Sequence, residues 1–293
     1  MGKIKVSHYQ VFSRVANQGN PAGVVFGGEN LTTEEMQTIA KKVGFNETAF
    51  VLPPQEKETD YRIRFFTPGH EMDLCGHGTM AAVWGIIQKI EKKDLFYLET
   101  KAGVLAVRYQ QKTEELLMEQ ASARFLPFIG EVKDLCEAIG ITMEELDLRY
   151  PILYGSTGVW TLLVPIKKLS SFEKMKPKNH RFSEILVDNP YASVHPFSLE
   201  TYDFQVDLHG RHFSSSFSGT TEDPVTGTAS GVMGAYYLEQ IAQNETKVSL
   251  FIEQGNEMGR PGLVRVLAEK SSVGTQVMIA GIASFVEELE IDY

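Results

Sequence analysis

Apolar and polar positions alternate along residues 3–12, KIKVSHYQVF, in the period of a half-buried β-strand. A Gly/Asn/Pro turn then leads into a second apolar run, PAGVVF. From Thr32 or Thr33 to Gly44 the apolar residues recur at helical spacing, which predicts an amphipathic helix closed by the glycine. NETAFVLPP and YRIRFFTP predict two further strands, so the first part of the chain mixes sheet with helix.

Two stretches of small residues share one design and predict a duplicated architecture. Residues 71–89 read EMDLCGHGTMAAVWGIIQK, and residues 222–240 read EDPVTGTASGVMGAYYLEQ. Each has an acidic lead-in, a Gly-rich turn and a helix that becomes apolar. Cys75 in the first aligns with Thr226 in the second, a shift of 226 − 75 = 151 residues in a chain of 293. We therefore expect two related halves, each organised around one of these helices.

The fold class predicted from this pattern is α+β, with a mostly antiparallel sheet wrapped around a central helix in each of two pseudo-symmetric domains. The pattern changes to a loop around ASARFLPFIGEV, where the chain is expected to cross between them. We predict a first domain of residues 1–122 plus about 279–293, and a second of residues 123–278. Within the second, YDFQVDLHGRHFSSS predicts a β-hairpin.

Charge and composition narrow the range of partners. The formal net charge of −10 argues against nucleic acid and against an anionic membrane surface. The start, MGKIKVSHYQVF, carries no apolar signal segment, and the apolar runs are shorter than a membrane span, so a cytoplasmic protein is expected. The two cysteines, Cys75 and Cys136, lack metal-type or disulfide-type spacing. A small anionic ligand remains compatible with the charge, because backbone amides can hold a carboxylate.

Both Gly-rich turns place unpaired backbone amides at the start of a helix, where the helix dipole attracts negative groups. Gly76 to Gly78 form one such set, and Gly227 with Thr228 forms the other. In related domains the two turns are expected to face each other across a cleft. They would equally well serve helix-on-sheet packing, since small residues allow close approach.

Three readings of the first turn compete. GHGTMA has the form of a dinucleotide-binding turn, but RIRFFT ends well before Gly76 and the second turn lacks the second glycine, so no nicotinamide or flavin is expected. Cys75 and His77 could be a nucleophile, metal or proton-transfer pair. No third and fourth ligand recur nearby, so no metal is predicted. A racemase with two thiols is unfavourable because Thr226 takes the second position.

Glu47 is the other candidate for chemistry. It lies in the turn before the apolar run TAFVL, where a lone carboxylate at the mouth of a buried strand is placed to have a raised pKa. A solvated loop acid would give the same spacing. The sequence pattern alone leaves both open.

Taken in order, HYQVF, GNPAGVV, NETAFV, RIRFFTP, DLCGHGT and EDPVTGTASG resemble the phenazine-biosynthesis PhzF-like family of the diaminopimelate epimerase fold superfamily. The similarity runs over nearly the whole chain. It implies two pseudo-symmetric domains with the active site in the cleft, and commonly a homodimer. The family's catalytic glutamate corresponds to Glu47. Its substrate-contacting residues correspond to Gly76 and His77, and to Asp223 and Thr228, while Asn20 in GNPAGVV is a further possible site residue.

The resemblance implies an isomerase that works without a cofactor. Glu47 would remove a proton from a carbon of a small carboxylate-bearing, cyclic or unsaturated substrate and return it elsewhere. One alternative is an epimerase-related dehydratase or epimerase of a cyclic amino acid that uses Cys75, because CGHGT also resembles the hydroxyproline epimerase turn. A second alternative is a small-molecule binding protein without chemistry.

Overall fold

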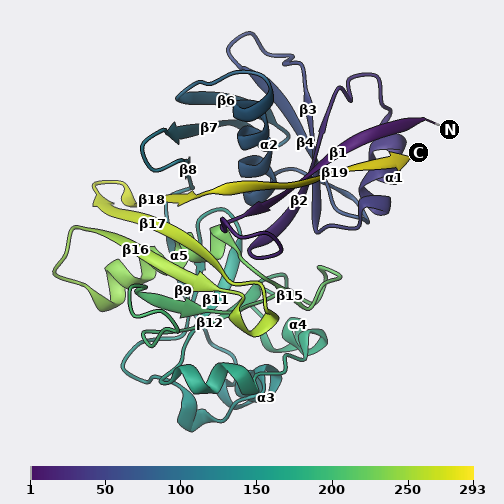
Figure 1. The fold of residues 1–293 in the computed structure, drawn as a ribbon. Helices are drawn as coiled ribbons and strands as arrows, with labels where there is room; N and C mark the ends of the chain where they lie inside the picture. Colours follow the sequence, from purple (N-terminus) through teal and green to yellow (C-terminus); the bar gives the residue numbers. More distant parts are fainter. Residues whose placement is uncertain (1) are drawn as a thin grey trace. The chain divides into compact units, whose positions relative to one another are not determined.

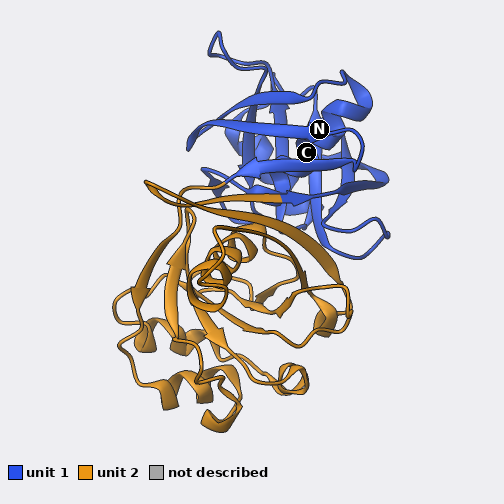
Figure 2. Cartoon of the chain, turned by 90° about the vertical axis from the view of Figure 1, so that its left-hand side faces the viewer, with its two compact units in different colours: residues 1–119, 280–293 blue, residues 120–279 orange. Residues whose placement is uncertain are grey.

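The computed structural model describes residues 2–293, and the chain divides into two compact units. Figure 2 shows residues 1–119 and 280–293 as the first unit and residues 120–279 as the second. The sequence pattern predicts the divisions at 122/123 and near 278/279, whereas the contacts place them at 119/120 and 279/280. Strand β18, Gly274–Gly281, returns the chain to the first unit. No helix within residues 2–293 is both long and apolar enough to cross a membrane.

The first unit contains a mixed sheet with one helix on each face. Its strands are β1 Lys3–Val11, β2 Asn20–Phe26, β3 Glu47–Leu52, β4 Tyr61–Phe66, β5 Glu71–Met72, β6 Leu95–Thr100, β7 Gly103–Gln110, β8 Glu115–Glu119 and β19 Ala283–Asp292. Strand β1 pairs with β19 and with β2, and the order continues through β3, β4, β6 and β7 to β8 (Figure 1). The pairs β2–β3 and β4–β6 are parallel and the rest are antiparallel, so the sheet is mostly antiparallel as predicted.

Helices α1, Thr33–Val43, and α2, Gly76–Lys89, cover opposite faces of this sheet. Phe66 packs with the buried face of α1, whereas a ring atom of its neighbour Phe65 approaches Gly78 of α2. Successive residues of a strand point to opposite faces, which places the two helices on opposite sides. Thr32 caps α1 in a reciprocal capping box with Glu35, and Gly44 ends the helix at φ 73°. The predicted bounds of α1 are therefore confirmed.

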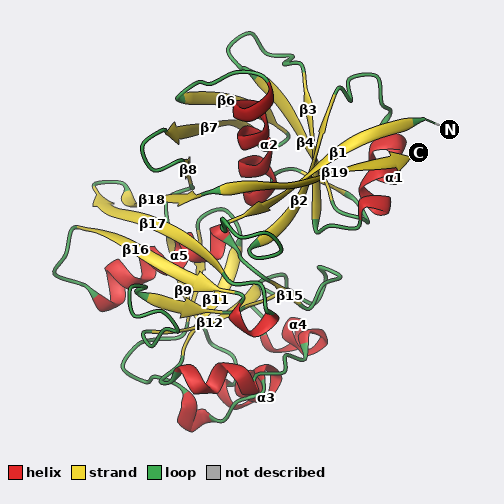
Figure 3. Cartoon of the chain, in the orientation of Figure 1, coloured by secondary structure: helices red, strands yellow, loops and turns green. Residues whose placement is uncertain are grey.

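The second unit repeats the plan. Its strands are β9 Arg124–Pro127, β10 Leu153–Ser156, β11 Trp160–Pro165, β12 Ser193–Ser198, β13 Leu208–Gly210, β14 His212–Phe213, β15 Glu222–Asp223, β16 Lys247–Gln254 and β17 Gly262–Ser271. Here too two pairs, β11–β12 and β13–β16, are parallel. Its helices are α3 Val132–Ile139, α4 Phe182–Ile185 and α5 Gly227–Tyr236, with short helical turns at Met143–Glu145, Leu169–Lys174, Asn179–Arg181, Tyr237–Ile241 and Asn256–Met258 (Figure 3).

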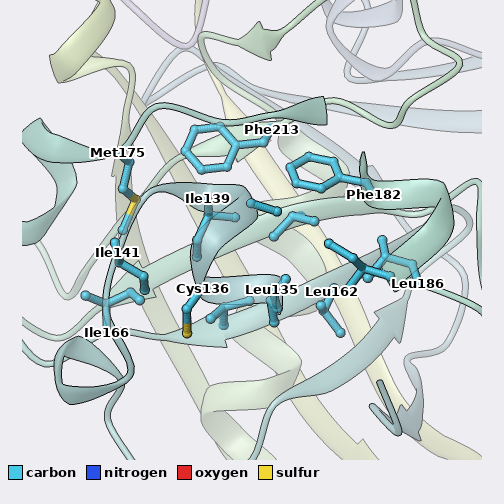
Figure 4. Close-up of a cluster of buried hydrophobic side chains, with 14 of the residues drawn as sticks. Leu135, Cys136, Ile139, Ile141, Leu162, Ile166, Met175, Phe182, Leu186 and Phe213 are labelled. Carbon is cyan, nitrogen blue, oxygen red and sulfur yellow. The ribbon is translucent and has the colours of Figure 1, made fainter. Parts of the chain in front are cut away.

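Helices α3 and α5 lie on opposite faces of the second sheet. Tyr154 of β10 belongs to the buried cluster around α3, which Figure 4 shows with Leu135, Cys136 and Ile139. The next residue, Gly155, faces α5: a Cβ there would lie 2.6 Å from Val232. A side chain larger than hydrogen would push the helix away. Each unit therefore has one amphipathic helix on one face and one small-residue helix on the other.

Two sequence predictions for the second unit are wrong. Residues 124–127, expected as part of a loop, form β9, which pairs with β10 along their whole length. Residues 202–216 do not form a hairpin. Instead β13 pairs with β12 and β16, and β14 pairs with β12 and β15. Alternation of polar and apolar residues shows that a strand forms, but not which strand is its partner.

Candidate active site

Glu47 is the first residue of β3, and it stands where the loop after α1 enters the sheet. In the register of β2 and β3 it is opposite Ala22. The rest of β3 is buried, whereas 14% of the Glu47 side chain is exposed. The carboxylate therefore lies at the start of an apolar strand, where Glu47 pairs with β2 and the next residue, Thr48, pairs with both β2 and β4.

The turn DLCGHGT forms the N-terminus of α2. Cys75 is the N-cap residue in an extended conformation, and its Sγ accepts the backbone N–H of Gly78 at 3.2 Å. The hydroxyl of Thr79 donates to the carbonyl of Cys75 at 2.7 Å. Gly76 and His77 are the first two helical residues, so their backbone N–H groups have no carbonyl acceptor within the helix. Of the predicted set of unpaired amides at Gly76 to Gly78, the Gly78 amide is therefore taken by Cys75 Sγ.

His77 and Glu47, 30 residues apart in sequence, form a close ion pair. His77 Nε2 lies 2.6 Å from Glu47 Oε2, and only 10% of the His77 side chain is exposed. Burial lowers the pKa of His77, but the contacts of the ring with the Cys75 sulfur and the Glu47 carboxylate outweigh burial and hold the pKa well above the ordinary histidine value. The site therefore contains an imidazolium facing a carboxylate at a helix N-terminus.

Cys75 lies against the same ring. Its Sγ is 3.6 Å from His77 Nδ1 and 4.0 Å from Nε2, and 6% of the residue is exposed. Burial raises the pKa of the Cys75 thiol, and the nearby Glu47 carboxylate raises it further, against the lowering effects of His77 and the Gly78 amide. The neutral thiol is therefore favoured, which weakens Cys75 as a base or nucleophile.

Glu47, Cys75 and His77 each offer a ligand atom, and these atoms all lie within 4.8 Å of one another. Glu47, distant in sequence, thus supplies a third potential ligand that the spacing around Cys75 and His77 did not predict. The distances nevertheless suit an ion pair better than a zinc site. Nitrogen and oxygen ligands at zinc bond lengths of about 2.0 to 2.2 Å in a tetrahedron stand about 3.3 Å apart. The 2.6 Å between His77 Nε2 and Glu47 Oε2 is well below that separation.

Asn20 begins β2, next to Glu47's strand. It is fully buried, and it precedes by two residues Ala22, the register partner of Glu47. Residues two apart on a strand share a face. Asn20 and Ala22 are thus on the same face of β2, and Ala22 is the register partner of Glu47. This placement agrees with the prediction of Asn20 as a further site residue.

In the second unit, the turn EDPVTGT forms the N-terminus of α5. Thr226 is its N-cap residue, but the Thr226 hydroxyl donates to Asp223 Oδ2 and makes no cap hydrogen bond to the helix. Gly227 and Thr228 are the first helical residues. The carbonyl of Thr228 accepts the hydroxyl of Thr157 at 3.3 Å. The structure therefore brings Asp223, Gly227 and Thr228 together at one turn, as expected.

Gln254 supports this turn and was missed by the sequence analysis. Its amide Nε2 donates to the carbonyl of Asp223 at 2.7 Å, and its Oε1 accepts the backbone N–H of Thr226 at 3.2 Å. Gln254 is 1% exposed and lies at the end of β16. Its position, 28 residues after Thr226 with no motif around it, gives no signal in the sequence.

The acidic lead-ins of both turns are also explained. Arg64 binds Glu71 through Nε at 2.7 Å and Nη2 at 2.9 Å, and Arg211 binds Glu222 through Nε at 2.8 Å and Nη2 at 2.6 Å. In each unit the arginine stands two residues before a phenylalanine that pairs with the glutamate in register, Phe66 with Glu71 and Phe213 with Glu222. These glutamates anchor the turns through bidentate pairs and are not free for chemistry.

The fold defines a class. A chain built from two equivalent α+β units, each with a small-residue helix against its sheet, has the epimerase-like fold. The solved hydroxyproline epimerase of Agrobacterium vitis, with bound trans-4-hydroxy-L-proline, matches the fold at a TM-score of 0.63 and 12% identity, over 99% of this chain and 92% of that one.

The family model described as phenazine biosynthesis-like protein matches residues 9–288, and the chain belongs to that family. It is similar to the uncharacterized isomerase YfhB of Bacillus subtilis, with 45% identity over 291 residues and 98% of each chain covered. The solved phenazine biosynthesis protein of the PhzF family from Bacillus anthracis is 46% identical, with a TM-score of 0.96 over 100% of both chains. The chain is accordingly an isomerase of the epimerase-like PhzF family.

Proposed function

We propose that the protein is a cofactor-independent isomerase in which Glu47 carries a proton between carbons of a small carboxylate-bearing, cyclic or unsaturated substrate. The observation that supports this most is the ion pair of Glu47 with His77 at the N-terminus of α2. It joins a proton acceptor, a fixed positive charge and helix-start amides in one place.

The roles follow from the geometry of the first unit. His77 Nε2 faces Oε2 of Glu47, which leaves Oε1 as the oxygen that takes the proton from carbon. Negative charge then develops on the substrate while Glu47 becomes neutral. The His77 imidazolium and the amides of Gly76 and His77 stabilise that charge until Glu47 returns the proton to a different carbon. No net charge is gained or lost in the cycle.

In the second unit, Asp223, Gly227 and Thr228 are proposed to bind and orient polar groups of the substrate. Thr226 holds the Asp223 carboxylate through its hydroxyl, and Gln254 holds the backbone on both sides. The α5 amides, which the Thr226 side chain does not cap, suit a carboxylate.

A solvent-exchange screen tests the proposal. Cyclic amino acids and dihydro-aromatic acids are incubated with the protein in D₂O, and loss of carbon-bound hydrogen is followed by NMR. We expect exchange or isomerisation of at least one compound. Glu47→Gln, which preserves shape, should abolish it, whereas Glu58→Gln in the exposed β3–β4 turn should not. Full exchange by Glu47→Gln would refute the proposed role of Glu47.

The epimerase-type alternative uses Cys75 as the base, and the contact of its Sγ with His77 is the observation in its favour. The raised pKa of the thiol and the threonine at the equivalent position, Thr226, oppose it. Cys75→Ala would eliminate exchange if the thiol carried the proton. Thermal stabilisation by a ligand without any hydrogen exchange would instead identify a binding protein.

A further inference from the structure

The position of the Cys75 sulfur is fixed by its contacts with the first turn of α2. It accepts the N–H of Gly78 at 3.2 Å, and a Cβ on Gly78 would lie 3.1 Å from Sγ and 3.1 Å from the ring of Phe65. The carbonyl of Cys75 accepts both the amide of Thr79 at 2.9 Å and its hydroxyl at 2.7 Å. With its backbone and its side chain both anchored, the thiol cannot move without disturbing the first turn of α2.

The other side of this sulfur is the His77 ring. Sγ is 3.6 Å from Nδ1 and 4.0 Å from Nε2, a difference of only 4.0 − 3.6 = 0.4 Å. The sulfur therefore stands beside the ring and is not in line with a single N–H. The same ring meets the Glu47 carboxylate through Nε2, at 2.6 Å, and a carboxylate oxygen of Glu47 lies within 4.8 Å of the sulfur. A polarisable sulfur is a favourable neighbour for an aromatic cation.

The second unit shows that a helix N-cap at this position does not require a thiol. Its equivalent residue, Thr226, turns its hydroxyl to Asp223 and leaves α5 without a side-chain cap. The residue equivalent to His77 there is Thr228, by the same shift of 151 positions. The sulfur and the imidazole thus occur together in the first unit, and neither occurs at these positions in the second.

We propose that Cys75 is a positioning residue for His77: its sulfur packs beside the imidazole ring and holds Nε2 against the Glu47 carboxylate. It carries no proton itself. The consequence for turnover rests on the proposed function of Glu47, whereas the positioning of His77 can be measured without any substrate.

Two substitutions separate positioning from helix capping. Cys75→Ser retains a strong N-cap, because a serine oxygen accepts the Gly78 N–H well, but it replaces the large sulfur by a smaller oxygen. Cys75→Ala removes both the cap and the contact with the ring. Cys136→Ala is the matched control, because Cys136 is 2% exposed on α3 and its loss removes a buried thiol in the other unit.

The measurement is NMR of ring ¹⁵N-labelled histidine between pH 5 and pH 9, with His77 assigned by its disappearance in His77→Asn. Wild-type protein should show a His77 imidazolium well above the pH at which free histidine titrates. In Cys75→Ser and Cys75→Ala the His77 ring signals should shift and the ring should lose its proton at lower pH. Cys136→Ala should match wild type. Unchanged His77 signals in Cys75→Ser would overturn the proposal, even if Cys75→Ala proved too unstable to study.

With a substrate in hand, Cys75→Ser should lower kcat by about tenfold and change KM by less than about twofold, because the ring contact serves the reacting pair more than binding. Normal kcat with altered His77 signals would confine the role of the sulfur to structure and refute its role in turnover. If the Glu47 mechanism failed, the NMR result would still stand, so the two ideas fail separately.

Discussion

The turn before α2 and the turn before α5 have the same backbone plan and different chemistry. In both, an arginine clamps the lead-in glutamate, and this glutamate begins a two-residue strand. In both, a hydroxyl at the fourth helical position donates to the N-cap carbonyl, from Thr79 to Cys75 and from Ser230 to Thr226. The side chains on this plan differ. The first turn presents an imidazolium, a thiol and a partner carboxylate, whereas the second presents Asp223 and hydroxyl groups.

Under the proposed function, the two turns of this shared plan have different roles. The shared residues are those that fix the backbone, and their buried Arg–Glu pairs keep both helix starts in place. The residues that differ are those that can carry protons or bind polar groups. We infer that the first unit supplies the proton chemistry and the second supplies recognition, and the predictions below test that inference.

The largest predicted effect is the loss of turnover on replacing Glu47, compared with the effect of replacing Asp223. Glu47→Gln should lower turnover by about 10²- to 10⁴-fold, the range of general acid–base catalysis, with little change in KM. Asp223→Asn should mainly raise KM, by about tenfold, because it alters a polar contact while the proton carrier remains. Steady-state kinetics on a substrate from the exchange screen measures both. If Asp223→Asn stopped hydrogen exchange as completely as Glu47→Gln, the proposed division would be wrong.

The shared arginine clamps should differ in how much stability each provides. Arg211→Met should destabilise the second unit by about 3 to 5 kcal/mol, because it leaves the buried Glu222 carboxylate unpaired. Arg64→Met should cost less, since Lys101 also contacts Glu71 at 2.6 Å. The Arg211→Met/Glu222→Gln double variant should recover part of the loss by removing the unpaired charge.

Unit-specific probes make this measurement possible, because Trp84 lies in the first unit and Trp160 in the second, and they are the two tryptophans of the chain. After 5-fluorotryptophan labelling, each unit gives its own ¹⁹F signal during denaturant unfolding. Equal losses of stability in the two single variants would show that Lys101 contributes nothing to the first clamp.

Lowering the pH should destabilise the second unit through a histidine that the first unit lacks. His212 pairs with Asp223 in register, and the equivalent residue in the first unit is Phe65, which pairs with Met72. Burial lowers the pKa of His212 from 6.5 to about 4. The unfolded chain therefore binds a proton that the folded chain does not, so stability should fall as the pH drops from about 6.5 to about 4.

The loss from this one group should be at most about 3 kcal/mol, at 1.36 kcal/mol for each pKa unit. His212→Phe should reduce it, as judged by the Trp160 signal at pH 7 and pH 4.5. Some acid sensitivity should remain, because burial and the neighbouring histidines also lower the pKa of His195. A variant as acid-sensitive as wild type would exclude His212 as a source of the effect.

The sequence pattern predicted α1 closely, but it missed strand β9 and did not define all of the strand partners. Periodicity and capping residues predicted α1 to within a residue, because Thr32 and Gly44 act locally. The pairing of β13 and β14 was not predicted, since strands of two or three residues carry too little pattern to define a partner. Residues 124–127 were assigned to a loop because proline usually interrupts a strand. Pro127 is nevertheless the last residue of β9, where it pairs with Leu153 of β10.

For the site, the sequence motifs identified Glu47 and His77 separately, and the fold supplied their contact. The 2.6 Å pair depends on β3 and α2 meeting across the sheet, which no spacing rule contains. The same applies to Gln254, whose function depends on where β16 ends. The sequence motifs also did not show that the acidic lead-ins Glu71 and Glu222 form ion pairs with Arg64 and Arg211.

The smallest predicted effect concerns Gln254. Its side chain bonds to the backbone of the turn before α5, and the turn before α2 has a backbone amide in its place. In the first unit, a backbone amide, Ala102 N–H, donates to the carbonyl of Asp73 at 3.3 Å beside the turn. Gln254→Ala should destabilise the second unit by about 1 to 3 kcal/mol, because it leaves the Asp223 carbonyl and the Thr226 amide without this partner. It should also raise KM more than it lowers kcat. If the Trp84 signal of the first unit moved as much as the Trp160 signal, the effect would not be local to this turn, and Gln254 could not be the specific support of the recognition residues.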